Sequence, residues 1–198
     1  MRIDGDRLPT LETERLLLRW LDDRDVAALQ EVFSHPDVLR YWGGDPAHDA
    51  AGARRLLAQI HDGYARCELF QWGIARRGDD RVVGTCTLTR FDSRNRRAEV
   101  GFALARQHWG HGYASEAMSS LIAFAFAELD LIRLEADADP RNDRSIAVLE
   151  RLGFLREGLL RERWLVAGEA QDSVVFGLLR REWRVVAGAP FPRGSSRA

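Results

Sequence analysis

Hydrophobic and polar residues alternate with two different periods along the chain, and the change of period separates strands from helices. Apolar side chains at every second position indicate a strand, whereas apolar side chains three or four positions apart indicate an amphipathic helix. The pattern predicts about seven strands, at residues 14–21, 69–76, 81–91, 97–105, 131–139, 154–166 and 172–181. It also predicts about four helices, at residues 25–33, 47–66, 115–130 and 142–152.

The order of these segments indicates the fold class. A strand and two helices come first, three strands follow without an intervening helix, and helices and strands then alternate before a final hairpin. Such a mixed order predicts one α/β domain of the mixed α+β kind, with a mixed, twisted sheet flanked by helices. We expect the domain to cover residues 11–182 and the Gly-, Pro- and Ser-rich segment 183–198 to be a flexible tail.

Composition narrows the class of protein. The chain has 198 residues, of which 45% are hydrophobic, enough for one packed core. Acidic and basic residues nearly cancel to a formal net charge of −1, so the basic surface of a nucleic-acid-binding protein is not expected. No apolar run is long enough for a membrane span, and residues 1–10 lack the apolar core of a signal peptide, so we expect a cytoplasmic protein. The oligomeric state is not indicated.

Two residue counts exclude further chemistry. The chain has no lysine, so all 29 basic residues are arginine, which excludes a Walker A loop, a pyridoxal-phosphate Schiff base and a lysine nucleophile. Cys67 and Cys86 are too few for a disulfide framework or a cysteine-based zinc cluster. His108 and His111 are three positions apart without a third ligand, so no metal is expected.

A glycine-containing loop at residues 107–114 joins a predicted strand directly to a predicted helix. The first N–H groups of a helix have no partner inside the helix and carry a partial positive charge, so this position favours phosphate binding. Gly110 and Gly112 would allow the main chain to approach a diphosphate closely. A tight turn without a ligand is the alternative. A dinucleotide site is disfavoured, because Ser115 stands where the third glycine of the G-x-G-x-x-G motif is required.

Four motifs occur in order along the chain: Glu99–Leu104, Gln107–Gly112, Asp139–Ser145 and Leu152–Phe154. Together they resemble the GNAT superfamily of acyl-CoA-dependent N-acetyltransferases. The opening segment Thr13–Arg19 and the long tract to Gly177 resemble the branch that acetylates the N-terminal amino groups of ribosomal proteins. The resemblance covers residues 11–182. It implies a sheet that splays between the fourth and fifth predicted strands, and acetyl-CoA as co-substrate.

The resemblance also implies which residues hold acetyl-CoA. Phe102 and Leu104 would offer backbone groups to pantetheine, and the glycine loop would hold the diphosphate. The side-chain amide of Asn142 would contact pantetheine, although Asn142 is by itself also a good helix N-cap. The implied cofactor-binding set is Phe102, Leu104, Gln107, Trp109, Gly110, His111, Gly112, Tyr113, Ala114 and Asn142.

The chemistry of acetyl transfer requires a base and a way to release the thiolate. Amines have pKa values of about 8 to 10, so a base must remove a proton before attack. The resemblance assigns this role to Glu99, and an ion pair with Arg96 or Arg97 is the alternative. A backbone N–H near Ala103 or Leu104 would stabilise the oxyanion.

The group that assists the departing thiolate differs from the usual one of the family. Leu149 stands where many members place a tyrosine. In the ribosomal-protein branch the resemblance points instead to a serine, here Ser145, which we expect to hydrogen-bond the departing sulfur. A capping residue in the first turn of the helix is the alternative for Ser145.

The acceptor is the least determined part of the prediction. Tyr41 and Trp42 are candidates for the acceptor pocket, with Trp72 and Trp164 as further aromatic candidates, and core packing is the alternative. We predict direct acetyl transfer from acetyl-CoA to a primary amine, with a protein N-terminus as the first candidate. The alternatives are a small amine, such as an aminoglycoside or a polyamine, and a CoA-binding module without catalysis, which Leu149 motivates.

Overall fold

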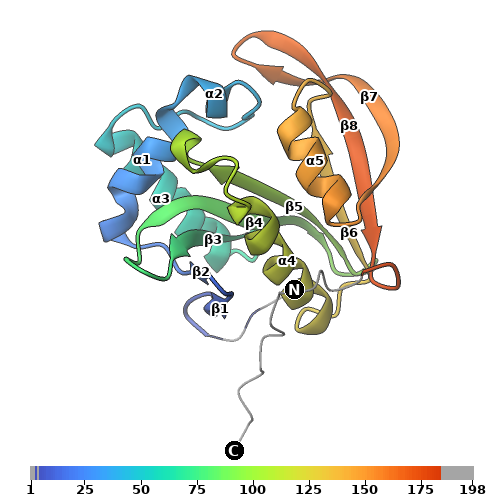
Figure 1. Ribbon diagram of the computed structural model, residues 1–198, viewed down its shortest axis with the longest axis horizontal. Helices are drawn as coiled ribbons and strands as arrows, with labels where there is room; N and C mark the ends of the chain where they lie inside the picture. The colour runs from blue at the N-terminus through green and yellow to red at the C-terminus, as the bar shows by residue number, and fades with distance from the viewer. Residues whose placement is uncertain (1–2, 4, 184–198) are drawn as a thin grey trace, which may run out of the picture.

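A mixed sheet of eight strands forms the centre of the molecule (Figure 1). The computed structural model describes residue 3 and residues 5–183, so the expected tail lies outside the described residues except for Trp183. The spatial order of the strands is β1-β2-β3-β4-β5-β6-β8-β7. Their bounds are β1 (Leu11–Glu12), β2 (Leu16–Arg19), β3 (Leu69–Arg76), β4 (Val82–Asp92), β5 (Arg97–Leu104), β6 (Arg133–Ala138), β7 (Leu155–Val166) and β8 (Glu169–Leu179).

Helices lie on both faces of this sheet. The α-helices are α1 (Val26–Ser34), α2 (Pro36–Leu39), α3 (Ala50–Ala65), α4 (Tyr113–Ala127) and α5 (Asp143–Arg151). Two 3₁₀ turns, η1 (Asp23–Asp25) and η2 (Arg106–His108), precede α1 and the glycine loop. Within the described part of the chain, no helix is long and apolar enough to cross a membrane.

The predicted class, a mixed α/β fold with a mixed sheet, is confirmed. Two elements were missed. Strand β1 has only two residues, too few for an alternating pattern to be seen. Helix α2 lies where a loop was expected, because Pro36 ends α1 yet fits the first position of the next helix, where no N–H is needed. The side chain of His35 accepts a hydrogen bond from the Asp37 N–H and caps α2.

Two hydrophobic cores lie on opposite faces of the sheet. Side chains of α4 and α5 pack into the larger core, which takes Phe70, Trp72 and Ile74 from β3. Side chains of α1 and α3 pack into the smaller core, which takes Ala75 from the same strand. Alternate residues of β3 therefore face opposite layers, as the period of a strand requires.

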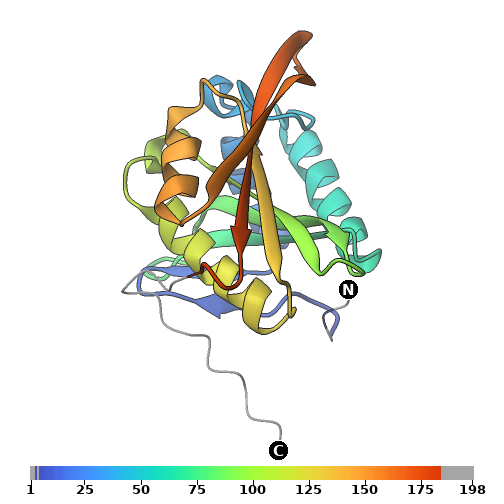
Figure 2. The same ribbon diagram turned by 90° about the vertical axis from the view of Figure 1, so that its right-hand side faces the viewer.

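The sheet opens between β5 and β6. These two strands pair in parallel only from Arg97 and Arg133 to Glu99 and Glu135, and they separate beyond that point. The separation falls between the fourth and fifth predicted strands, as expected. On the far side of β6, strands β8 and β7 form a long hairpin that projects past the other strands (Figure 2). The open edge of β5 therefore faces a space bounded by β6, α5 and the hairpin.

Candidate active site

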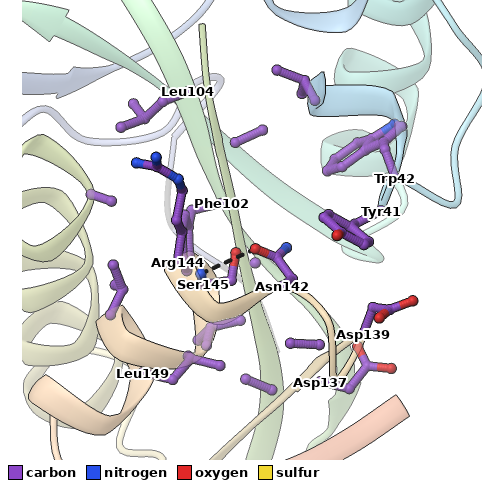
Figure 3. A pocket seen from close by; sticks show the side chains of 18 of the residues that line it. Tyr41, Trp42, Phe102, Leu104, Asp137, Asp139, Asn142, Arg144, Ser145 and Leu149 are labelled. Carbon is purple, nitrogen blue, oxygen red and sulfur yellow. Dashed lines mark hydrogen bonds between the residues drawn. The ribbon is translucent and has the colours of Figure 1, made fainter. Parts of the chain in front are cut away.

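A cavity of about 730 Å³ lies where β5 and β6 separate. Strands β5 and β6, the glycine loop and the first turn of α4, helix α5, the segment after α2, and the β7–β8 hairpin all contribute to its lining. Figure 3 shows side chains from β5, β6, α5 and the segment after α2 converging on one space, with α5 on one side and Tyr41 and Trp42 on the other. Three of the four motifs identified in the sequence thus meet at a single site, whereas Leu152 and Phe154 of the fourth are buried in the core.

The open edge of β5 presents unpaired backbone groups to the cavity. The N–H of Ala105 donates to the Val83 carbonyl on the β4 side, whereas the Arg96 carbonyl accepts from Ile132 on the β6 side. Backbone groups of successive strand residues point to opposite sides, so even-numbered residues of β5 face the gap. These residues are Val100, Phe102 and Leu104.

Phe102 and Leu104 therefore face the cavity through their backbones, in the geometry that the family resemblance requires. The Leu104 carbonyl already accepts a hydrogen bond from the Trp109 indole N–H, at 2.8 Å. The Leu104 N–H points into the gap between β5 and β6, whereas the Ala103 N–H points toward β4. Ala103 and Leu104 are the two candidate donors of a hydrogen bond to the oxyanion. Only the N–H of Leu104 points into the cavity. Binding of pantetheine by these groups stays a prediction.

The glycine loop ends in an uncapped helix N-terminus. Gly110 and Gly112 have φ values of 80° and 78°, in the left-handed region that favours glycine. Gly112 is the N-cap of α4 and makes no side-chain cap. No acceptor among the described residues is placed on the N–H groups of Tyr113, Ala114 and Ser115, all of which line the cavity. Such a terminus fits an anion.

The segment before β2 anchors this loop from the opposite side. The guanidinium of Arg15 donates to the His111 carbonyl at 3.0 Å and pairs with Glu116 at 2.7 Å. Glu116 also accepts a hydrogen bond from Thr13 Oγ1 at 2.6 Å. Burial alone would raise the pKa of Glu116, but the hydrogen bonds from Thr13 and Arg15 hold it below its ordinary value.

Two residues of the implied cofactor-binding set have side chains outside the cavity lining. The amide of Gln107 donates to Glu31 on α1, which ties the loop to that helix. The ring of His111 stacks on Tyr113 with centroids 5.6 Å apart, and its Nδ1 lies 3.0 Å from the Trp109 carbonyl. Both side chains hold the loop in place. Among the described residues, no group of three potential ligands could hold a metal, and the expectation of a metal-free site stays a prediction.

Helix α5 contributes two arginines that the sequence analysis missed. Arg144 and Arg151 are seven residues apart, so they lie on the same face of the helix, and both line the cavity. The Arg144 guanidinium lies 5.5 Å from the centre of the Trp109 ring, and Arg151 Nη1 lies 3.5 Å from Ser115 Oγ. Neither forms an ion pair with a carboxylate of the described chain. Together with the α4 N-terminus they concentrate positive charge at this end of the cavity.

Asn142 and Ser145 lie side by side at the start of α5 (Figure 3). Asn142 Oδ1 accepts a hydrogen bond from the Ser145 N–H at 3.2 Å, so Asn142 is the N-cap of α5. Only the backbone of Ser145 takes part in this cap, and its hydroxyl has no partner in the described part of the chain. Leu149, one turn further on, is buried and lines the same wall. Contacts of Asn142 and Ser145 with substrate stay predictions.

Glu99 lies at the base of the cavity, at the last pair of β5 with β6. Its carboxylate is 19% exposed and pairs with Arg90 at 3.1 Å. The expected alternative partners, Arg96 and Arg97, are wrong, because Arg96 pairs with Asp130 and Arg97 turns to carboxylates outside the cavity.

Burial and neighbouring charges set the protonation of Glu99. Burial is the main cause that raises its pKa, and the negative charge of Asp137 on β6 raises it further. Arg90 and Arg163 act in the opposite direction, but the net shift is upward. A carboxylate with a raised pKa in a cavity suits general-base chemistry.

The aromatic side chains divide between cavity and core. Tyr41 and Trp42 both line the cavity, as expected of candidate pocket residues, and Trp164 does so as well. The Tyr41 hydroxyl donates to the Arg141 carbonyl at 3.3 Å. Trp72 is a correction: its side chain is fully buried in the core and donates to the Pro9 carbonyl, because β3 is covered on both faces.

This fold matches solved acetyltransferases. The structure of Mycobacterium smegmatis RimJ in complex with CoA-disulfide aligns with a TM-score of 0.80, 24% identity and coverage of 88% of each chain. The protein therefore has the fold of the acetyltransferases. The chain itself belongs to the acetyltransferase (GNAT) domain family, whose model matches residues 15–155. It is an acetyl-CoA-dependent N-acetyltransferase, and the family resemblance of the sequence is confirmed.

Relatives of known sequence agree with this assignment. A Bacillus licheniformis protein named as the uncharacterized N-acetyltransferase p20 is 39% identical over 176 residues, which cover 89% of this chain and 99% of p20. The [ribosomal protein uS5]-alanine N-acetyltransferase of Escherichia coli is 25% identical over 180 residues, covering 87% of this chain and 92% of that enzyme.

Proposed function

We propose that the protein transfers the acetyl group of acetyl-CoA directly to a primary amine, with a protein N-terminal amino group as the first candidate. The observation that carries this proposal is the division of charge within the cavity. Arg144 and Arg151, which have no carboxylate partner among the described residues, lie near the glycine loop and the α4 N-terminus. Glu99 and Asp137, paired with Arg90 and Arg163, lie where β5 and β6 separate. The diphosphate of CoA is anionic and an amine is cationic at neutral pH, so the two ends match the two substrates.

The cofactor end follows from the backbone geometry. The free N–H groups at the start of α4 would bind the diphosphate, with Arg144 and Arg151 as its counter-charges. The pantetheine arm would then extend along the open edge of β5, where Phe102 and Leu104 offer backbone groups. This path brings the thioester to the open edge of β5, on the strand that carries Glu99 at its other end.

The chemical step requires removal of one proton before the amine can attack. Glu99 accepts this proton, directly or through water, and the amine lone pair then forms a bond to the acetyl carbon. The Leu104 N–H stabilises the negative charge that develops on the acetyl oxygen. The carbon–sulfur bond breaks, and the electron pair leaves with the CoA thiolate. Ser145 donates a hydrogen bond to that sulfur, and the proton that neutralises it comes from the amine or from water.

The acceptor class rests on the relatives and on the cavity together. One relative carries the name of an N-acetyltransferase that acts on an alanine of ribosomal protein uS5. Tyr41 and Trp42 line the cavity on the side opposite α5, where they would contact the first residues of a peptide. A small amine remains the second candidate, because the acidic end of the cavity would also attract a polyamine. Cytoplasmic location stays a prediction.

Release of the CoA thiol, measured as an initial rate at saturating acetyl-CoA, tests this proposal. The acceptor panel contains peptides with N-terminal alanine or serine, spermidine and an aminoglycoside. We expect release above the rate without acceptor, highest for the peptides. If thiol release is fastest with spermidine or the aminoglycoside, the acceptor is a small amine and not a protein N-terminus. If the protein binds acetyl-CoA tightly but releases no thiol with any amine, it is a CoA-binding module.

A further inference from the structure

Asp137 on β6 lies beside Glu99 in the cavity, and no direct contact with a substrate has been assigned to it so far. Glu135 is the last residue of β6 that pairs with β5, and Asp137 comes two positions later. The two side chains therefore lie on the same face of the sheet, with Asp137 just beyond the point where the strands separate. Its side chain is 17% exposed and lines the cavity. It therefore stands on the opposite strand from Glu99, across the start of the gap.

One oxygen of this carboxylate is held firmly. Asp137 Oδ2 accepts hydrogen bonds from the Trp164 indole N–H at 2.7 Å and from Ser173 Oγ at 2.8 Å. Arg163 Nε lies 3.4 Å from the same oxygen. Trp164 is itself flanked by the guanidinium groups of Arg90 and Arg163, 5.1 and 5.3 Å from its ring centre. The carboxylate is thus oriented before any substrate arrives.

The other oxygen is available. No hydrogen-bond donor of the described residues is placed on Asp137 Oδ1, and the side chain lines the same cavity as Glu99. Glu99 likewise uses only Oε2, in its hydrogen bond with Arg90. Two carboxylates, each with one free oxygen, therefore face the space in which the acceptor nitrogen must lie. An alkylammonium has three N–H donors and can bridge both.

We propose that Asp137 is a specificity-determining residue that binds the ammonium form of the acceptor through Oδ1. This inference rests on the proposed amine acetyltransferase activity and assigns how the acceptor is recognised. The ammonium donates one N–H to Asp137 and a second toward Glu99. Glu99 takes the proton, and the neutral amine stays bound to Asp137 with its lone pair free to attack the acetyl carbon.

The assignment predicts selection for charge. An acceptor that is cationic before binding gains a charge-assisted hydrogen bond from Asp137, whereas an aromatic amine, uncharged at neutral pH, gains little. Both acceptors offer a nitrogen that can be acetylated, but only the cationic one can form the charged hydrogen bond. A comparison of their kinetic constants therefore isolates the binding role of Asp137.

The test compares Asp137→Asn with wild type on two acceptors, a peptide with N-terminal alanine and aniline. For the peptide we expect KM to rise about tenfold to a hundredfold, the loss typical of a hydrogen bond to a charged group. For aniline we expect kcat/KM to change by less than about threefold. The dissociation constant of acetyl-CoA, measured by calorimetry, should stay at the wild-type value.

Two further variants control for structural damage. Glu135→Gln removes a carboxylate from the same face of the same strand but outside the cavity, and it should preserve the peptide KM. Ser173→Ala removes one of the groups that orient Asp137 while keeping its charge, so it should raise the peptide KM less than Asp137→Asn does. Thermal melting accompanies each variant.

The outcomes separate this inference from the activity on which it rests. Equal losses on both acceptors, or an unchanged peptide KM in Asp137→Asn, would overturn the assignment while leaving acetyl transfer intact. If wild-type protein binds acetyl-CoA but acetylates neither acceptor, the proposed function fails and the assignment falls with it.

Discussion

Glu99 has the environment that a base for amine deprotonation needs. Burial is the larger cause that raises the pKa of Glu99, and the negative charge of Asp137 is the next. The positive charge of Arg90 lowers this pKa and so favours the ionised form. A neutral group at this position could not accept the proton. In the proposed mechanism, Glu99 contributes to the rate more than to binding.

Glu99→Gln should lower kcat/KM by about 10² to 10⁴-fold, the usual loss for a general base, with acetyl-CoA binding unchanged. The deficit should shrink as the pH rises, because more of the amine is then already neutral. Initial rates across a pH series measure this. A variant with the same pH profile and rate as wild type would remove Glu99 from the role of base.

The wild-type pH profile carries the signature of the raised pKa. Glu99 acts in its ionised form, so kcat/KM falls as the pH drops through its pKa, and this limb should lie above the pKa of about 4.3 for free glutamate. Asp137→Asn removes one negative charge and should shift the limb to lower pH. Glu135, Arg90 and Arg163 also face Glu99 and remain in that variant. A limb that does not move would show that Asp137 and Glu99 do not interact.

Ser145 and Asn142 should separate in their kinetic effects, although they are neighbours. Ser145→Ala should lower kcat with little change in acetyl-CoA affinity, because its hydroxyl is needed only as charge develops on sulfur. Asn142→Ala should weaken acetyl-CoA binding and also cost about 1 kcal/mol of stability through the lost cap. Calorimetry and thermal melts accompany the kinetics. Normal turnover by Ser145→Ala would leave thiolate protonation to the amine or to water.

Which single residues could be predicted from the sequence depended on local motifs. The local sequence predicts Asn142 as an N-cap, and the family resemblance predicts Glu99 as the base, because each stands at a fixed place in a short motif. Asp137 was missed, since its role arises only where β6 separates from β5. Arg144 was also missed, although its spacing to Arg151 on a predicted helix was a usable signal.

At the scale of elements, the glycine loop and α4 form the proposed anion site. Their conformation depends on two residues in the left-handed region, Gly110 and Gly112. A Cβ added at Gly110 would meet no atom within 4 Å, so the protein itself leaves this space open. The space fits a ligand that approaches the main chain closely.

Gly110→Val should raise the acetyl-CoA dissociation constant at least about tenfold, or about 1.4 kcal/mol, by adding bulk where the diphosphate approaches. Gly168→Val is a matched control, because Gly168 also has a positive φ of 84° and open space around it, but lies in the β7–β8 turn. Calorimetry measures both variants. Equal affinities in folded Gly110→Val and Gly168→Val would refute the loop assignment.

Most elements followed from the periodicity of the sequence, and the exceptions have physical causes. Long strands such as β4 and the amphipathic helix α3 repeat their pattern several times, so their type is unambiguous. Helix α2 has a single turn and depends on the cap from His35, which a periodicity cannot reveal. Strand β1 is defined only by the pairing of its two residues with β2, and this pairing cannot be seen in a local sequence pattern.

In the proposed function, the whole molecule brings two substrates together at one break in its sheet. The location of that break could be expected only from the family resemblance, since the point at which β5 and β6 stop pairing is set by contacts between segments distant in the sequence. The charge division across the cavity likewise depends on which arginines lack carboxylate partners, and this requires the three-dimensional structure. Tyr41 and Trp42, which line the cavity opposite α5, stay candidates for contact with the acceptor.

Direct transfer within this cavity requires both substrates to be bound at the same time. The most direct test is a two-substrate initial-rate experiment in which acetyl-CoA is varied at several fixed concentrations of an acceptor peptide, with mass spectrometry of the products. The account predicts intersecting lines in the double-reciprocal plot, one acetyl group on the peptide amine and unmodified enzyme. Parallel lines together with an acetylated form of the enzyme would contradict it.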